Sequence, residues 1–154
     1  MRKAVCLILV TVFLVQVPLH AGIDKDAAMY IGGTVSTIPE KSEGRLDFIA
    51  QDKMVFRWKN GSWDLPYAQI KSLEYGQKAG RRVGVAIVVT VWALFSKKRR
   101  HFLTIGFQDA QGNNQAMLVE IGKAKVKVSL AILEARTGLK VEYESDEARK
   151  HVHG

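Results

Sequence analysis

The chain has 154 residues, 47% of them hydrophobic, which suits one domain with a single buried core and excludes two domains of ordinary size. It carries 23 basic and 15 acidic residues, but nine of the cations lie at residues 2–3 and 78–100. The rest of the chain has 14 basic and 15 acidic residues. This balance excludes an overall basic surface of the kind that binds nucleic acid. The local cationic patch indicates a docking site for something anionic.

The N-terminal segment, residues 1–21, has the plan of a secretory signal peptide. A positively charged start precedes an apolar stretch of 14 residues, Pro18 interrupts it, and Ala21 is a small residue before the expected cut. An uncleaved anchor is the alternative, although a membrane-spanning helix needs roughly 20 residues. The only cysteine, Cys6, lies in this segment, so the mature protein has no disulfide and no cysteine-based metal site. We therefore expect an exported protein, in the periplasm or elsewhere in the cell envelope.

Alternating apolar residues predict five strands in the first half of the chain. The glycine pair Gly32 and Gly33 inside the first strand indicates a bulge or a close approach of backbones. Asn60 and Gly61 predict a two-residue hairpin turn with positive φ at both positions. Pro66 cannot donate to a ladder, so it ends a strand or marks a sheet edge. The expected strands cover residues 29–35, 44–49, 54–58, 62–66 and 67–76.

The second half adds two strands and one helix. Residues 101–109 and 114–121 alternate like the earlier strands, whereas residues 123–137 change to a helical period that ends at Gly138, a residue suited to a left-handed cap. The helix places Val126, Leu130, Leu133 and Thr137 on one face, with Val128 and Ile132 beside it. A single β-rich domain over 22–143 follows, with residues 139–143 adding an extended piece and 144–154 forming a charged flexible tail.

The apolar run at the centre of the chain stands apart from both halves. Thirteen uncharged residues, 83–95, lie between cationic flanks, and the domain therefore carries an apolar insertion, about 83–96 within 81–100, between its fifth and sixth strands. As a helix the run would be about 20 Å long, too short to cross a hydrocarbon core of roughly 30 Å. We expect it to attach the domain to an anionic membrane surface. The candidate membrane-binding residues are Arg81, Arg82, Val85, Ile87, Val88, Val91, Trp92, Leu94, Phe95, Lys97, Lys98, Arg99 and Arg100.

Two other interpretations of this run remain open. Apolar runs of about 10 to 14 residues are also typical of buried core elements. The same surface would equally serve self-association or a contact with an envelope protein.

The order of seven short strands and a closing helix resembles the pleckstrin-homology-like superfold, including GRAM-type domains. In that fold the amphipathic C-terminal helix caps a seven-stranded bent sheet or partly open barrel. More closely, the fragments YIGGTV, EGRLDF, LPYAQIKSLEYGQKAGRR, KKRRHFLTIGF and EIGKAKVKVSLAILEARTGLKVEY, within residues 30–143, resemble small exported bacterial proteins of undescribed function of the Acidobacteria type. The resemblance implies a fold and no activity.

One departure from pleckstrin-homology domains bears on the ligand. Members that bind phosphoinositides carry basic residues in the loop between the first two strands, whereas residues 36–43 here contain Glu40, Lys41 and Glu43. Phosphoinositide recognition is therefore not carried over.

No stretch of the chain has a catalytic signature. His101 stands alone at the start of a strand, and His151 and His153 make an HxH pair without the third and fourth ligands that a metal site needs. Trp58 and Trp63 flank the predicted hairpin and are expected to pack across it, with an aromatic platform for a ligand as the alternative. We expect no cofactor, no metal and no enzymatic activity.

These observations favour a noncatalytic, exported, membrane-associated adaptor or ligand-binding module of the bacterial cell envelope, attached through residues 83–95 and their basic flanks. The alternative is a soluble periplasmic module that uses the same segment to self-assemble or to bind another protein.

Overall fold

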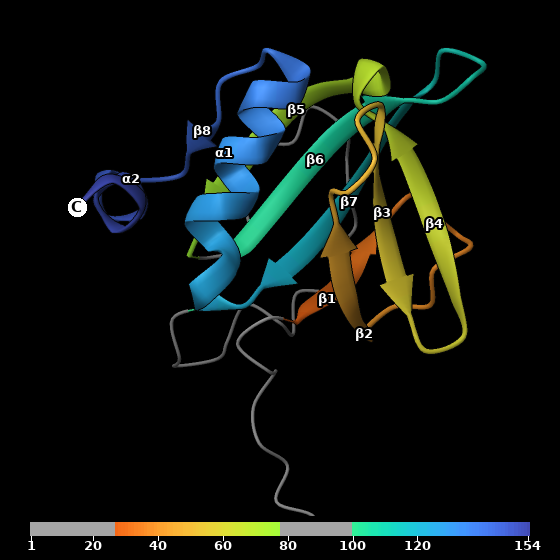
Figure 1. The fold of residues 1–154 in the computed structure, drawn as a ribbon, viewed down its shortest axis with the longest axis horizontal. Helices are drawn as coiled ribbons and strands as arrows, with labels where there is room; N and C mark the ends of the chain where they lie inside the picture. The colour runs from red at the N-terminus through yellow and green to blue at the C-terminus, as the bar shows by residue number, and fades with distance from the viewer. Residues whose placement is uncertain (1–26, 78–99) are drawn as a thin grey trace, which may run out of the picture.

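Over residues 27–77 and 100–154, which the computed structural model describes, the protein is mainly β, with one mixed eight-stranded sheet that is not closed and two C-terminal helices (Figure 1). The strands are β1 (Ala28–Gly33), β2 (Ser42–Asp47), β3 (Lys53–Trp58), β4 (Gly61–Pro66), β5 (Ile70–Gly76), β6 (Phe102–Gln108), β7 (Asn114–Ile121) and β8 (Glu142–Tyr143). The helices are α1 (Val126–Thr137) and α2 (Asp146–His153), with short 3-10 turns η1 (Tyr67–Gln69) and η3 (Lys123–Lys125). The strand order is β4-β3-β2-β1-β7-β6-β5-β8, and only β5 and β8 pair in parallel.

The sheet bends so strongly that the strands around β4 and the strands around β6 face each other across one core. The ring of Trp63 on β4 lies 5.5 Å from that of Phe107 on β6, although four strands separate β4 from β6 in the sheet order. The inward side chains of both groups of strands belong to one buried cluster. Helix α1, which lies beside β5 and β6 in Figure 1, adds three side chains to this cluster. The α1 contributors are Val126, Leu130 and Leu133, as the helical period predicts. Gly138 ends α1 with φ 72°, which confirms the predicted left-handed cap.

The first strand contains the predicted irregularity. The pairing of β1 with β7 shifts between Tyr30 and Gly32, so a bulge is present where the paired glycines indicate one. Gly33 has φ 147°, and a Cβ built on it would lie 2.3 Å from the carbonyl oxygen of Ala116. The end of β1 therefore approaches the β7 backbone more closely than any side chain would allow.

The β3–β4 hairpin is present, but its predicted turn is wrong. Trp58 and Gly61 are cross-strand partners, so the turn consists of Lys59 and Asn60, and neither Asn60 nor Gly61 has a positive φ. A Cβ at Gly61 would lie 3.0 Å from Cζ2 of Trp58. The glycine is therefore needed for the indole ring that lies over it and not for the turn conformation.

The two tryptophans do not form the predicted cross-strand pair. The register sets Trp63 opposite Phe56, and each indole packs on a phenylalanine. Trp58 stacks on Phe56 at 5.9 Å, while Trp63 tilts against Phe107. Pro66 ends β4, which is an edge strand of the sheet, as expected for a residue without an N–H donor.

The C-terminal region differs from the predicted flexible tail at 144–154. Residues of this region form α2, because the Ser145 side chain accepts a hydrogen bond from the Ala148 amide at 3.2 Å and two acidic residues occupy the first turn. Ala148 is fully buried in the core cluster. The extended piece before it forms β8, so the sheet has eight strands over the described residues where seven were predicted, and residues 67–69 form η1 instead of continuing β5.

Candidate functional site

One end of the sheet collects every point at which the described chain meets the residues outside it. Gly76, the last residue of β5, pairs with Phe102 of β6, which in turn pairs with Glu120 of β7. The amide of Gly122, just after β7, donates to the carbonyl of Ala27 at 3.0 Å. Figure 1 shows these strand ends together at the lower edge of the molecule. We call this edge, where Ala27, Gln77 and Arg100 lie, the insertion end.

Arg100 is the one candidate membrane-binding residue that belongs to the described part of the chain. Its Nη1 donates to Oε2 of Glu120 at 3.1 Å, and the Glu120 side chain is only 11% exposed. Burial raises the pKa of Glu120, and the Arg100 charge opposes that shift. Arg100 therefore has a partner on β7 that sequence reasoning did not indicate. The other twelve candidates, at positions 81–99, and the apolar insertion itself lie outside the described residues.

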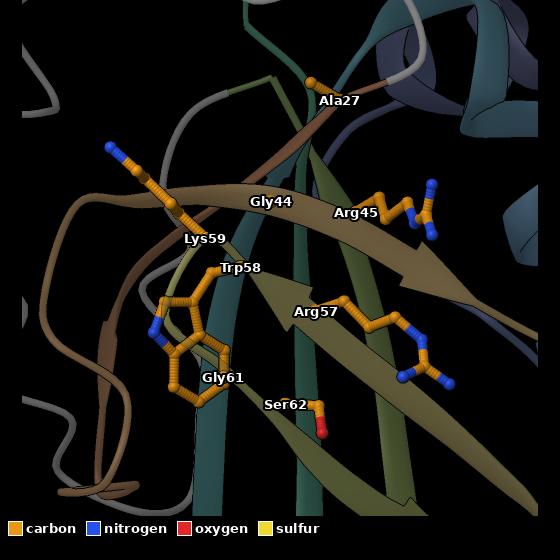
Figure 2. Close-up of a pocket in the computed structure, with 8 residues that line it drawn as sticks. All are labelled: Ala27, Gly44, Arg45, Arg57, Trp58, Lys59, Gly61 and Ser62. Atoms are coloured by element: carbon orange, nitrogen blue, oxygen red, sulfur yellow. The ribbon is translucent and has the colours of Figure 1, made fainter.

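A groove of about 640 Å³ opens at the same end, over β2, β3 and β4 (Figure 2). We call it the β2–β3 groove. Among the described residues, the lining of this groove carries three cations and no carboxylate. The lining residues are Ala27, Gly44, Arg45, Arg57, Trp58, Lys59, Gly61 and Ser62.

Two arginines stand side by side in this groove. Arg45 of β2 and Arg57 of β3 are cross-strand partners, and Ser62 of β4 is the partner of Arg57 on its other side. Figure 2 shows both arginine side chains extending in the same direction, while the Trp58 ring lies on the other side of β3. Both arginines are exposed, so the pair presents two guanidinium groups to solvent.

The two arginines differ in their partners. Arg57 Nε donates to Oδ2 of Asp47 at 3.0 Å. The backbone amide of Ile49 and then Arg57 lower the pKa of Asp47, so this carboxylate stays charged and holds the Arg57 side chain in place. Arg45 forms no hydrogen bond or ion pair with the residues that the structure describes.

A second polar cluster joins α2 to the sheet. The hydroxyl of Tyr75 on β5 and Nδ1 of His101 form a buried hydrogen bond of 2.7 Å, and the His101 ring stacks on that of His151 at 4.6 Å. Burial lowers the pKa of His101 to about 4, with contributions from the nearby charges of His151 and Lys123. Burial also raises the pKa of Tyr75 to about 12. His101 is therefore neutral at pH 7 and serves as a packing surface for α2.

The HxH pair of the sequence is divided between two partners. His151 faces His101, whereas Nε2 of His153 forms a hydrogen bond of 3.0 Å with the hydroxyl of Tyr143. Within residues 27–77 and 100–154, no group of three or more His, Cys, Asp or Glu side chains is placed to hold a metal ion.

Sequence reasoning missed the arginine pair of the groove. Its signal was present, because Arg45 and Arg57 occupy outward positions of two strands joined by a short loop. Closing that loop symmetrically over residues 48–52 would, however, set Arg45 opposite Val55, because the observed register is centred on Gln51. The sequence pattern therefore places both arginines on the outer face of the strands but does not set them opposite each other.

The comparisons with known proteins place the chain in no family. No family model matches it, and a search of curated proteins finds no significant match. Among the helices of the described residues, none has the length and apolar character needed to cross a bilayer.

Proposed function

We propose that the protein is a noncatalytic, exported adaptor or ligand-binding module of the bacterial cell envelope, attached to an anionic membrane surface through residues 83–95 and their basic flanks. The observation that carries this proposal is the insertion end. Ala27, Gln77 and Arg100 leave the described domain at one edge of the sheet, so an insertion between Gln77 and Arg100 can reach a surface that faces this edge without the domain intervening.

Charge at the same edge supports this orientation. The β2–β3 groove adds three cations, Arg45, Arg57 and Lys59, to the cationic flanks of the insertion. A cation near an anionic membrane surface contributes on the order of 1 kcal/mol to binding. Several of them together support reversible attachment without a membrane-spanning helix.

We further propose a pleckstrin-homology-like architecture of the small exported bacterial type. Seven strands in the order β4-β3-β2-β1-β7-β6-β5, followed by a helix that covers the core of the bent sheet, support it. The parallel pairing of β8 and the presence of α2 are additions to that plan.

Deleting residues 83–96 tests the attachment. We expect the protein purified from cells that express the full chain to sediment with anionic vesicles. The deletion variant should partition onto these vesicles at least about tenfold less, because it lacks the apolar contact. We expect the deletion variant to fold, since Gly76 and Phe102 are cross-strand partners and the remaining residues between them can join the two strands. Vesicle co-sedimentation measures partitioning, and thermal unfolding shows that both proteins are folded.

The control variant keeps the apolar run and changes only its charged flank, with Lys97, Lys98 and Arg99 replaced by Gln. It should bind more weakly than the parent and lose part of its salt dependence, because the other cations of the flanks and of the groove remain. Equal sedimentation of the parent and the deletion variant would contradict attachment through the insertion. A parent that stays in the supernatant, and whose larger size in gel filtration falls on deletion, would instead support the soluble self-assembling module.

A further inference from the structure

The arginine pair of the β2–β3 groove is a costly arrangement for a sheet. Arg45 and Arg57 are direct cross-strand partners, and like charges in that position destabilise an antiparallel pair. Asp47 forms an ion pair with Arg57, and its charge also attracts Arg45 more weakly, although Arg45 has no ion-pair partner among the described residues. Among the described residues, a single carboxylate therefore faces two adjacent guanidinium groups.

The surroundings of the pair leave room for an anion. Small side chains flank the two arginines in the groove, Ser62 beside Arg57 and Ala27 toward the start of β1. The groove volume of about 640 Å³ far exceeds that of a phosphate group. Ser62 also supplies a hydroxyl donor at the rim.

The chemistry of the pair selects the class of anion. Guanidinium groups form paired hydrogen bonds with phosphate and carboxylate oxygens, and two of them side by side match a group with several charged oxygens. Asp47 accepts a hydrogen bond from Nε of Arg57, and the terminal nitrogens of that side chain have no hydrogen-bond partner among the described residues. A phosphate group fits this arrangement better than a single carboxylate.

We propose that Arg45 and Arg57 bind the phosphate of an anionic phospholipid headgroup. The groove opens at the insertion end, so its ligand lies at the surface that the insertion would contact. This inference rests on the proposed membrane association and adds the headgroup contact to it. The pair gives the domain a preference for phosphate over other anionic groups at a membrane surface.

Changing both arginines to Gln in the full chain tests the site. Partitioning is measured on two types of phosphatidylcholine vesicle that have the same surface charge. One type takes its charge from phosphatidylglycerol, and the other takes it from the carboxylate of oleate. We expect R45Q/R57Q to lose about tenfold or more in partitioning to phosphatidylglycerol vesicles and clearly less on oleate vesicles. The matched control, K71Q/K140Q, removes two exposed cations away from the groove and should lose less than about threefold on either.

The outcomes separate this site from the attachment itself. Equal losses in the two double variants, or no loss in R45Q/R57Q, would overturn the phosphate site and leave attachment through the insertion intact. Loss in R45Q/R57Q while the 83–96 deletion variant binds normally would support the site and contradict the insertion. Glycerol 3-phosphate tests the soluble source: shifts of groove resonances in NMR spectra, together with unchanged vesicle binding of R45Q/R57Q, would assign the groove to a free phosphate ester and overturn the lipid proposal.

Thermal unfolding supplies a readout that does not depend on any ligand. Arg45→Gln removes the repulsion from its direct partner Arg57 together with a weaker attraction to Asp47, so we expect its Tm at low salt to rise by about one degree. A fall in Tm would show that Arg45 stabilises the sheet, and the argument from a destabilising charge pair would be contradicted.

Discussion

Acidification from pH 7 to pH 4 is expected to lower the free energy of unfolding by about 3 kcal/mol through His101 alone. The His101 side chain is neutral and buried, and burial, followed by the charges of His151 and Lys123, lowers its pKa from 6.5 to about 4. Below pH 6.5 the imidazole of His101 binds a proton in the unfolded chain but stays neutral in the folded protein. Stability is therefore fully present above pH 6.5 and falls until about pH 4.

The groups around His101 explain why protonation is resisted. The Tyr75 hydroxyl occupies its Nδ1, the His151 ring stacks on its face, and the carbonyl of His101 accepts from the amide of Ile121 at 2.7 Å. A charge on His101 would be buried next to another histidine, so the packing of α2 on His101 would weaken.

Urea unfolding between pH 7 and pH 4 measures this dependence, with His101→Asn as the test variant. The slope of stability against pH should become much shallower in this variant. Burial raises the pKa of Glu120, so its protonation favours the folded state, whereas the lowered pKa values of Asp47 and Asp109 make their protonation near pH 4 oppose it. His153→Gln removes an exposed histidine from the same helix and should retain the parent slope. An unchanged slope in His101→Asn would show that another group causes the pH dependence.

Gly33→Ala is expected to destabilise the fold by about 3 kcal/mol or more, a fall in Tm of about 10 °C. The new Cβ would lie 2.3 Å from the carbonyl oxygen of Ala116, and the residue would keep φ 147°. That oxygen cannot move away freely, because it accepts from the amide of Thr34 at 2.9 Å, and the amide of Ala116 donates to the Thr34 hydroxyl. The substitution therefore separates β1 from β7 near the middle of the sheet.

Gly112→Ala is the matched control for this prediction. Gly112 has φ 83°, yet a Cβ there would have nothing within 4 Å, so its variant carries backbone strain without a clash. We expect it to lose about 1 kcal/mol. Thermal or urea unfolding of both variants measures the difference, and similar losses would mean that the close approach of β1 to β7 contributes little.

Local patterns were sufficient for most of the elements. Alternation predicted the positions of β1 to β7, and the helical period together with Gly138 predicted α1, because both signals depend on residues only two to four positions apart. The exceptions are also local in origin. Asn60 and Gly61 read as a turn, but the nearby Trp58 ring decides which residue must be glycine.

The candidate site could be predicted from the sequence only in part. The sequence identified the cationic apolar insertion, which lies outside the described residues, and placed it between two strands that the structure pairs at Gly76 and Phe102. It did not indicate that Arg100 pairs with Glu120, that Arg45 stands opposite Arg57, or that a predicted tail would become α2.

By itself, the sequence determined the mainly β class, the order of the strands along the chain and the separation of the cationic run from a charge-balanced domain. Only the tertiary structure decided which distant residues meet: His101 with His151, Trp63 with Phe107, and the strand ends that form the insertion end. The reason is physical. Periodicity records which side of an element is buried, whereas the bend of the sheet and the register between its strands decide what lies against that side.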